Sequence, residues 1–119
     1  DGALVRASGL VALPVRPAGT TPSAVLSYQH ATTFENAYAP SVNLAPAEPP
    51  LVLASLGYIV VASDYVGFAD SQGLDHPYLQ ADATARAVLD MLTAAQRWRS
   101  DCSSSGGSLT VVVMASSFW

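Results

Sequence analysis

The most constraining feature of this sequence is the block of residues 58–90, which has the pattern of one strand, one loop and one helix. Tyr58–Ala62 is an uninterrupted apolar run rich in β-branched residues, and it ends at Ser63–Tyr65. Such a run predicts a strand buried on both faces, with helices on both sides of the sheet. A glycine-containing loop follows, and Pro77 begins a helix. This order is typical of one unit of a mainly parallel sheet.

The helix of this unit is expected from Pro77 to about Trp98. Apolar residues recur there at intervals of four and three positions, whereas Asp82, Arg86 and Asp90 line another face. The apolar stripe consists of Ala81, Ala85, Val88, Leu92 and Ala95. Because small residues dominate this stripe, the helix is expected to pack closely on a sheet.

Four shorter elements surround this unit. Pro14 and Pro17 end the first apolar run, which is typical of an edge strand. Gly57 is the expected stop of a short helix. The expected elements are an edge strand at Gly9–Val15, a strand at Ser23–Tyr28, a helix at Pro50–Leu56 and a strand at Leu109–Met114.

The composition allows two interpretations of the surface. Half of the 119 residues are apolar and 12% are charged, against about 25% charged residues in ordinary soluble domains. Either the chain is simply rich in alanine and valine, or part of its surface is covered by further sequence or by a partner chain.

Charge and cysteine content exclude several classes of function. The net charge is −4 and the five basic residues are all arginines, so we expect no nucleic-acid partner. The sequence contains no apolar stretch of about 18 residues, so it predicts no transmembrane segment. Cys102 is the single cysteine, which rules out an intrachain disulfide.

The chain begins at Asp1 rather than methionine, which favours a removed upstream segment and a secreted or periplasmic location.

The segment GYIVVASDYVGFADS, from Gly57 to Ser71, followed by His76–Tyr78 (HPY), resembles secreted lipases and esterases of the α/β-hydrolase superfamily, whose pattern is GYVVVAPDYLGLGDS…HPY. The resemblance covers residues 5–98, and residues 99–119 form a divergent C-terminal segment. It implies a partial α/β-hydrolase fold, with a mainly parallel sheet and flanking helices. Since complete domains of this kind need roughly 200–300 residues, residues 1–119 are expected to be a single, incomplete domain: a fragment, a truncated product or a reduced relative.

The turn Tyr28–Thr33 (YQHATT) is similar to the HGTT-like turn of this family. The resemblance implies that His30, Ala31 and Thr32 form one side of an oxyanion hole, in which backbone N–H groups stabilise negative charge on the former carbonyl oxygen. Ala31 replaces the family's glycine, and this restricts the backbone. The alternative is a polar turn in which His30 caps a strand.

The resemblance also places Asp64 and Tyr65 at the floor of the active site, in the loop after a strand. Ala69 replaces a further glycine of the family pattern in this loop. The alternative for Asp64 is a buried or turn-capping carboxylate. Beside Asp75, His76 invites interpretation as a base or metal ligand, but two imidazoles in the whole chain make a poor metal site. We expect His76 to cap a helix, and we expect neither a metal nor a cofactor.

The end of the chain contains the candidate nucleophile. If Val111–Met114 is the strand before the family's G-x-S-x-G turn, Ser117 occupies the nucleophile position. Trp119 then stands where a small residue is required, and no aspartate and histidine partners follow. Because a serine without a base is a poor nucleophile at neutral pH, the chain alone is expected to be inactive.

Three functional hypotheses remain open. The first is the N-terminal part of a serine ester hydrolase that cleaves small carboxylic esters through an acyl-enzyme. The second is a non-catalytic module that self-associates or complements another fragment through apolar strand edges at Ser23–Tyr28 and Leu109–Met114, so that a homo-oligomer is expected. The third is a small hydrolase that uses Asp64, Asp70 and His76 at the carboxyl ends of strands.

Overall fold

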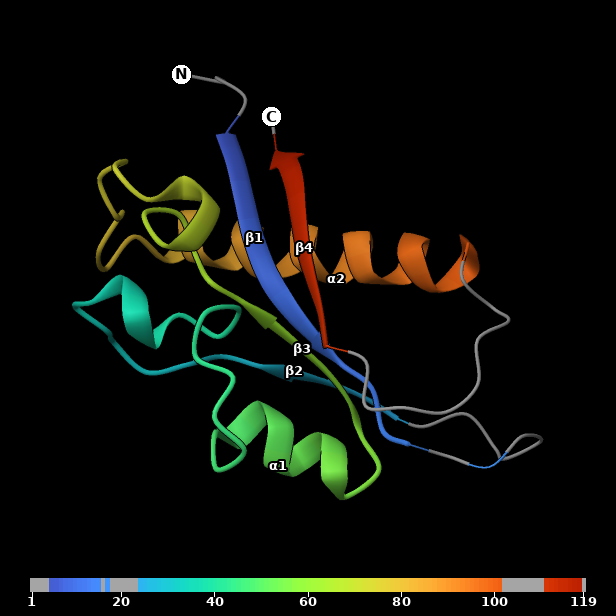
Figure 1. The fold of residues 1–119 in the computed structure, drawn as a ribbon. Helices are drawn as coiled ribbons and strands as arrows, with labels where there is room; N and C mark the ends of the chain where they lie inside the picture. The colour runs from blue at the N-terminus through green and yellow to red at the C-terminus, as the bar shows by residue number, and fades with distance from the viewer. Residues whose placement is uncertain (1–4, 16, 18–23, 102–110, 119) are drawn as a thin grey trace.

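In a computed structural model of the chain, the described residues are 5–15, 17, 24–101 and 111–118, and from residue 98 onward only the backbone is described. A mixed sheet forms the middle layer, with α1 on one face and α2 on the other (Figure 1). The strands are β1 (Val5–Ala12), β2 (Val25–Tyr28), β3 (Ile59–Ser63) and β4 (Val111–Phe118). The helices are α1 (Pro49–Ser55) and α2 (Ala81–Asp101), with single 3₁₀ turns η1 (Asn36–Tyr38) and η2 (Ala69–Ser71).

The strand order is β2-β3-β1-β4, and it corrects the expected fold class. Among the paired neighbours only β2 and β3 are parallel, because β1 runs antiparallel to both β3 and β4. The expectation of a mainly parallel sheet, and with it of a partial α/β-hydrolase fold, is therefore wrong. An apolar run reports that both faces of a strand are covered, and it carries no information on the direction of the neighbouring strands.

The first strand was expected at an edge of the sheet, and this is also wrong. β1 pairs with β3 on one side and with β4 on the other. Pro14 lies beyond its last residue, Ala12, so that it limits the length of the strand without disturbing its hydrogen bonds. Within the described residues, β2 and β4 form the two edges.

The expected strand after Gly57 and the short helix before it are confirmed. All five residues of β3 are buried, and their side chains alternate between the two helices. Gly57 ends the α1 segment with a φ of 105°, a value that favours glycine. The layer beneath α1 consists of Leu10, Ala12, Leu51, Ala54, Val60 and Ala62, and the layer beneath α2 consists of Val11, Ile59, Val61, Met91 and Ala95.

The long helix begins four residues later than expected and presents a different face to the sheet. Leu79 has a φ of 59°, which interrupts the helix that Pro77 was expected to begin. The side chains most buried against the sheet are Met91 and Ala95, while Ala81 and Ala85 of the expected stripe are exposed. The predicted apolar stripe is thus rotated partly away from the core.

Gly9 of β1 permits the close approach of α2. A Cβ atom at this position would lie 2.6 Å from the carbonyl oxygen of Ala62 and 2.7 Å from the sulfur of Met91. Both distances are shorter than any real Cβ contact, so a side chain at residue 9 would separate α2 from the sheet.

Candidate functional site

Three of the segments singled out in the sequence lie at the same end of their strands, and two of them are in contact. Because β1 is antiparallel to β3 and β4, the strands β2, β3 and β4 all run in one direction. The turn with His30 follows β2, Asp64 and Tyr65 follow β3, and Ser117 lies near the end of β4, in register with Arg6. The role of Ser117 as a nucleophile stays a prediction.

The predicted oxyanion turn contacts the predicted floor of the site directly. The rings of His30 and Tyr65 lie with their centroids 4.4 Å apart and their planes at 35°. Phe68 and His76 extend this contact, with centroids 5.0 Å apart, and His76 lies 6.3 Å from Tyr65. We call His30, Tyr65, Phe68 and His76 the aromatic cluster.

Both imidazoles of the aromatic cluster are oriented by backbone carbonyl groups. The Nδ1 atom of His30 lies 2.7 Å from the Ala31 oxygen, and that of His76 lies 2.6 Å from the Val66 oxygen. Since a carbonyl oxygen only accepts hydrogen bonds, Nδ1 bears a proton in each ring and donates it to the carbonyl group. The Nε2 atom of His30 is buried and has no hydrogen-bond partner among the described residues.

Asp64 is a fully buried carboxylate that joins three segments of the chain. It accepts a hydrogen bond of 2.6 Å from the Ser8 hydroxyl of β1, and one of 2.8 Å from the backbone N–H of Ser41. The Ser41 hydroxyl donates a third, short hydrogen bond. Buried charge is tolerated when hydrogen bonds satisfy it in this way. Asp64 therefore anchors the end of β3 and is not accessible to a substrate.

Tyr65 has a strained backbone directly after this anchor. Its φ is 64°, which is unusual for a residue with a bulky side chain. Its N–H donates to the Ser63 hydroxyl at 3.2 Å, and its side chain is buried. Burial raises the pKa of the Tyr65 phenol above its ordinary value of 10.0, and the proximity of Tyr28 raises this pKa further. The phenol thus remains protonated throughout the neutral range.

The loop after Tyr65 has positive φ values at Gly67 and Ala69. Gly67 has a φ of 101°, and a Cβ atom there would lie 2.9 Å from Cβ of His76. Ala69 also has a positive φ, 48°, and its N–H donates to the side-chain oxygen of Asn36. A positive φ is unfavourable for a residue that has a Cβ atom, so Ala69 is a strained residue.

Sequence reasoning missed Ser8, Asn36 and Ser41, which hold the site from other parts of the chain. Ser8 was the one of these with a local signal, because a small polar residue interrupts an apolar strand there. Asn36 and Ser41 lie in a loop-like segment without periodicity, so nothing in the local sequence marks them. Their roles depend on folding against β3 and η2.

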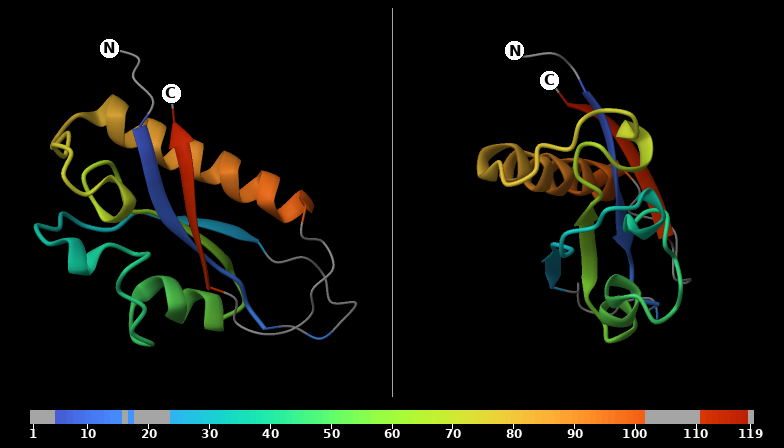
Figure 2. Two further views of the ribbon diagram at one scale, coloured as in Figure 1. Left: turned by 45° about the horizontal axis from the view of Figure 1, so that its top comes forward. Right: turned by 90° about the vertical axis from the view of Figure 1, so that its left-hand side faces the viewer.

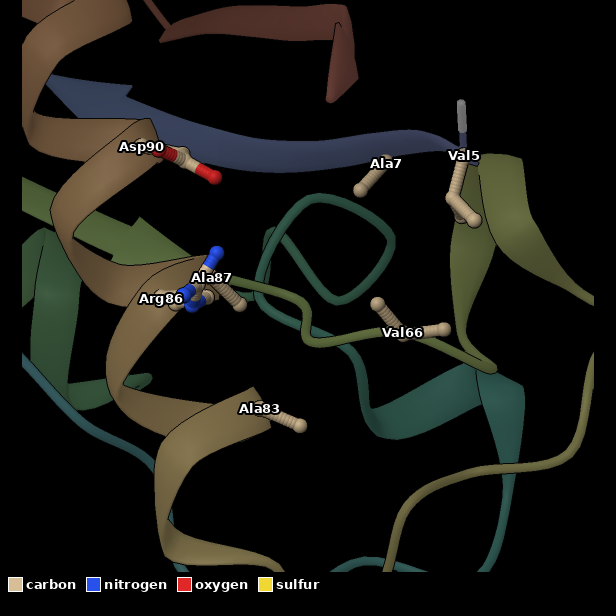
Figure 3. Close-up of a pocket in the computed structure, with 7 residues that line it drawn as sticks. All are labelled: Val5, Ala7, Val66, Ala83, Arg86, Ala87 and Asp90. Carbon is tan, nitrogen blue, oxygen red and sulfur yellow. The ribbon is translucent and has the colours of Figure 1, made fainter. Parts of the chain in front are cut away.

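Two cavities border the cluster and the sheet, and they differ in size. A small cavity of about 70 Å³ lies between α2 and the start of β1, lined by Ala7, Val66, Ala87 and their neighbours (Figure 3). An open hollow of about 340 Å³ lies over the turn, lined by residues 30–35 and Tyr38. Of these two, the hollow over the turn offers more room for a small organic ligand.

One ion pair lies at the rim of the site. The Nε atom of Arg6 and a carboxylate oxygen of Asp70 are 3.0 Å apart, and both side chains are substantially exposed. A pair of this kind contributes about 0–1 kcal/mol to stability. Asp70 and His76 were candidates for a separate hydrolytic centre together with Asp64, but Asp64 is enclosed by its serine partners.

The comparisons with known protein families, with curated proteins and with solved structures give no match to this chain. Among the described residues, no helix has the length and apolar character to cross a membrane. No group of three or more potential metal ligands occurs in the part of the chain that the structure describes.

Proposed function

We propose that this chain supplies one side of the active site of a serine ester hydrolase that acts on small carboxylic esters. In this proposal, the backbone of the turn His30–Thr32 stabilises the oxyanion, and Tyr65 forms the floor of the site. The observation that carries the proposal is the 4.4 Å contact between the rings of His30 and Tyr65. It joins two segments that one and the same family resemblance associates with a single site.

Two further features support this assignment. The turn opens onto the hollow of about 340 Å³, which leaves space for an ester above it. The positive φ values of Tyr65 and Ala69 are a second feature, since strained backbone geometry is concentrated at functional sites. The acyl-enzyme step would require a serine, a base and an acid, and for the serine we retain Ser117 as the candidate.

An NMR titration tests the oxyanion-binding role. The ¹⁵N-labelled chain is titrated with an alkyl phosphonate monoester, whose anionic tetrahedral phosphorus mimics the oxyanion of the acyl-transfer intermediate. We expect the largest amide shifts at Ala31 and Thr32, and several-fold tighter binding by Ala31→Gly, because glycine permits closer approach of the backbone to the ligand. Ala45→Gly, in another loop, is the matched control and should bind as the unmodified chain does.

A second measurement separates oxyanion binding from complete catalysis. Intact-mass analysis after incubation with a fluorophosphonate should show one adduct, mapping to Ser117, only if an activated serine is present. An adduct on another serine would contradict the assignment of Ser117. Amide shifts confined to regions away from residues 30–33 and 65 would contradict the oxyanion role itself.

A further inference from the structure

We infer that two copies of this chain associate through the outer edge of β2 and the adjoining exposed face of α2, which together form a self-complementary surface. The right-hand view of Figure 2 shows β2 and α2 on the same side of the molecule. This surface is separate from the aromatic cluster, and the inference does not depend on the proposed hydrolase function.

The first observation concerns the backbone of β2. The N–H of Ile59 bonds to the carbonyl of Ala24, so the backbone groups of residues 24, 26 and 28 are directed toward β3. Since successive residues of a strand direct these groups to opposite edges, Val25 and Ser27 direct theirs to the open edge. Among the described residues, no strand pairs with this edge.

The second observation is that β2 lacks the features that protect natural edge strands. Its sequence, VLSY, contains no charged residue and no proline. Val25 is 51% exposed, on the same face of the sheet as α2. A strand with these properties is suited to pairing with another strand.

The third observation is a pair of mainly apolar hollows beside α2. One has Val25 and Leu92 in its wall, and the other, of about 630 Å³, is lined by Gln29, which follows β2, and by Ala85, Val88 and other residues. These helix residues belong to the stripe that the sequence predicted and that the core leaves partly uncovered. Leu89, in the same wall, is 61% exposed.

The charge distribution selects a second copy as the occupant. None of the residues that line the two hollows beside α2 is charged. By contrast, Arg86 and Asp90 of α2 border the small cavity on the other side of the helix (Figure 3). A two-fold axis therefore brings two neutral surfaces together without repulsion, although each chain has a net charge of −4. A charged or basic partner would find no complementary group on this surface.

A two-fold arrangement can form backbone hydrogen bonds between the two β2 edges and at the same time pack the two α2 helices against each other. If the two-fold axis passes between the two copies of Leu26, Val25 pairs with Ser27 of the partner subunit. Both residues then use the backbone groups that face the open edge. The sheet then continues across the two copies, and the two α2 helices lie side by side on one face. Small residues such as Ala81 and Ala85 allow the helices to approach closely, at about 8–10 Å between axes.

Sedimentation and light scattering over a concentration series test the inference. We expect a species of twice the 12.3 kDa chain mass, with a dissociation constant on the order of tens of micromolar, as befits a small interface. Val25→Lys places a charge on the open edge and should weaken dimerisation at least about tenfold, because the interface would bury the lysine ammonium group without a partner of opposite charge. Val52→Lys on α1, where the valine is 41% exposed, is the matched control and should dimerise normally.

Amide hydrogen exchange provides a readout that is specific to the edge. At high protein concentration the amides of Val25 and Ser27 should exchange more slowly than at low concentration, whereas that of Leu26, directed toward β3, should not change. A monomeric chain up to about 1 mM, or equal weakening by both lysine variants with the fold intact by circular dichroism, would overturn the inference.

Discussion

At the scale of single residues, the site depends on groups that hold others in place. The buried carboxylate of Asp64 accepts hydrogen bonds from Ser8 and Ser41, and the next residue, Tyr65, bears the strained backbone and the ring contact to His30. Of the two interpretations of Asp64, a reactive group and a buried structural acid, the structure supports the second. Its influence on any chemistry would come through the position of Tyr65.

Replacing Asp64 with asparagine should destabilise the fold by about 1–3 kcal/mol, because an amide NH₂ group would face hydrogen-bond donors that now meet a carboxylate. Asp70→Asn is the matched control. Its carboxylate is only paired at the surface with Arg6, and its loss should cost less than about 1 kcal/mol. Urea unfolding measures both values. Equal effects of the two variants would show that the Asp64 hydrogen bonds are not the anchor of this region.

At the scale of elements, the contact between α2 and the sheet is determined by backbone space rather than by the apolar stripe. Gly9 allows Met91 to lie against β1, and Met91 is 2% exposed. The periodicity of α2 predicted a helix correctly but assigned its buried face incorrectly, because alanines of the stripe and of the neighbouring positions have similar hydrophobicity. The absence of a side chain at Gly9 is what leaves room for Met91 against β1.

Gly9→Ala should therefore lower the free energy of unfolding by about 1–3 kcal/mol, since the added methyl group overlaps the Ala62 carbonyl and Met91. Gly73→Ala separates this steric effect from a backbone effect. Gly73 has a φ of 98° but no atom within 4 Å of an added Cβ, so only conformational strain of about 1–2 kcal/mol is expected. Both costs are read from denaturant midpoints at constant m-value. A Gly9→Ala protein as stable as the unmodified chain would refute the tight contact.

At the scale of the whole molecule, the low content of charged residues bears on the surface where β2 and α2 adjoin. The chain has 12% charged residues, and none of the residues that line the two hollows beside α2 at β2 is charged. Of the two interpretations of the composition, a covered surface is the one that the proposed dimer would require. The dimer would cover it without burying any of the charged residues that border the small cavity.

If the chain dimerises, its thermal stability should depend on its concentration. The midpoint of thermal unfolding should rise as the protein concentration increases, because association favours the folded state by mass action. Val25→Lys should show a midpoint that depends less on concentration over the same range, and Val52→Lys should behave as the unmodified chain does. Calorimetry at several concentrations makes this measurement, and a constant midpoint for the unmodified chain would count against association.

The sequence by itself determined the elements whose signals are local. The apolar run at Tyr58–Ala62 predicted β3, and Gly57 predicted the end of the α1 segment, because burial on both faces and a positive φ leave direct marks on residue type. The association of the turn at His30 with the pair Asp64–Tyr65 came from the family resemblance and not from a local signal, and the structure brings the rings of His30 and Tyr65 into contact.

Only the tertiary structure decided the directions of the strands and the partners of the buried carboxylate. β1 enters the sheet antiparallel between β3 and β4, and an apolar strand has the same residue pattern in either direction. Ser41 reaches Asp64 across 23 positions and Ser8 across 56, and hydrogen bonds between such distant residues follow from the packing of the whole chain. Local propensity is encoded residue by residue, whereas strand order and long-range hydrogen bonds depend on which arrangement buries the most apolar surface with every polar group satisfied.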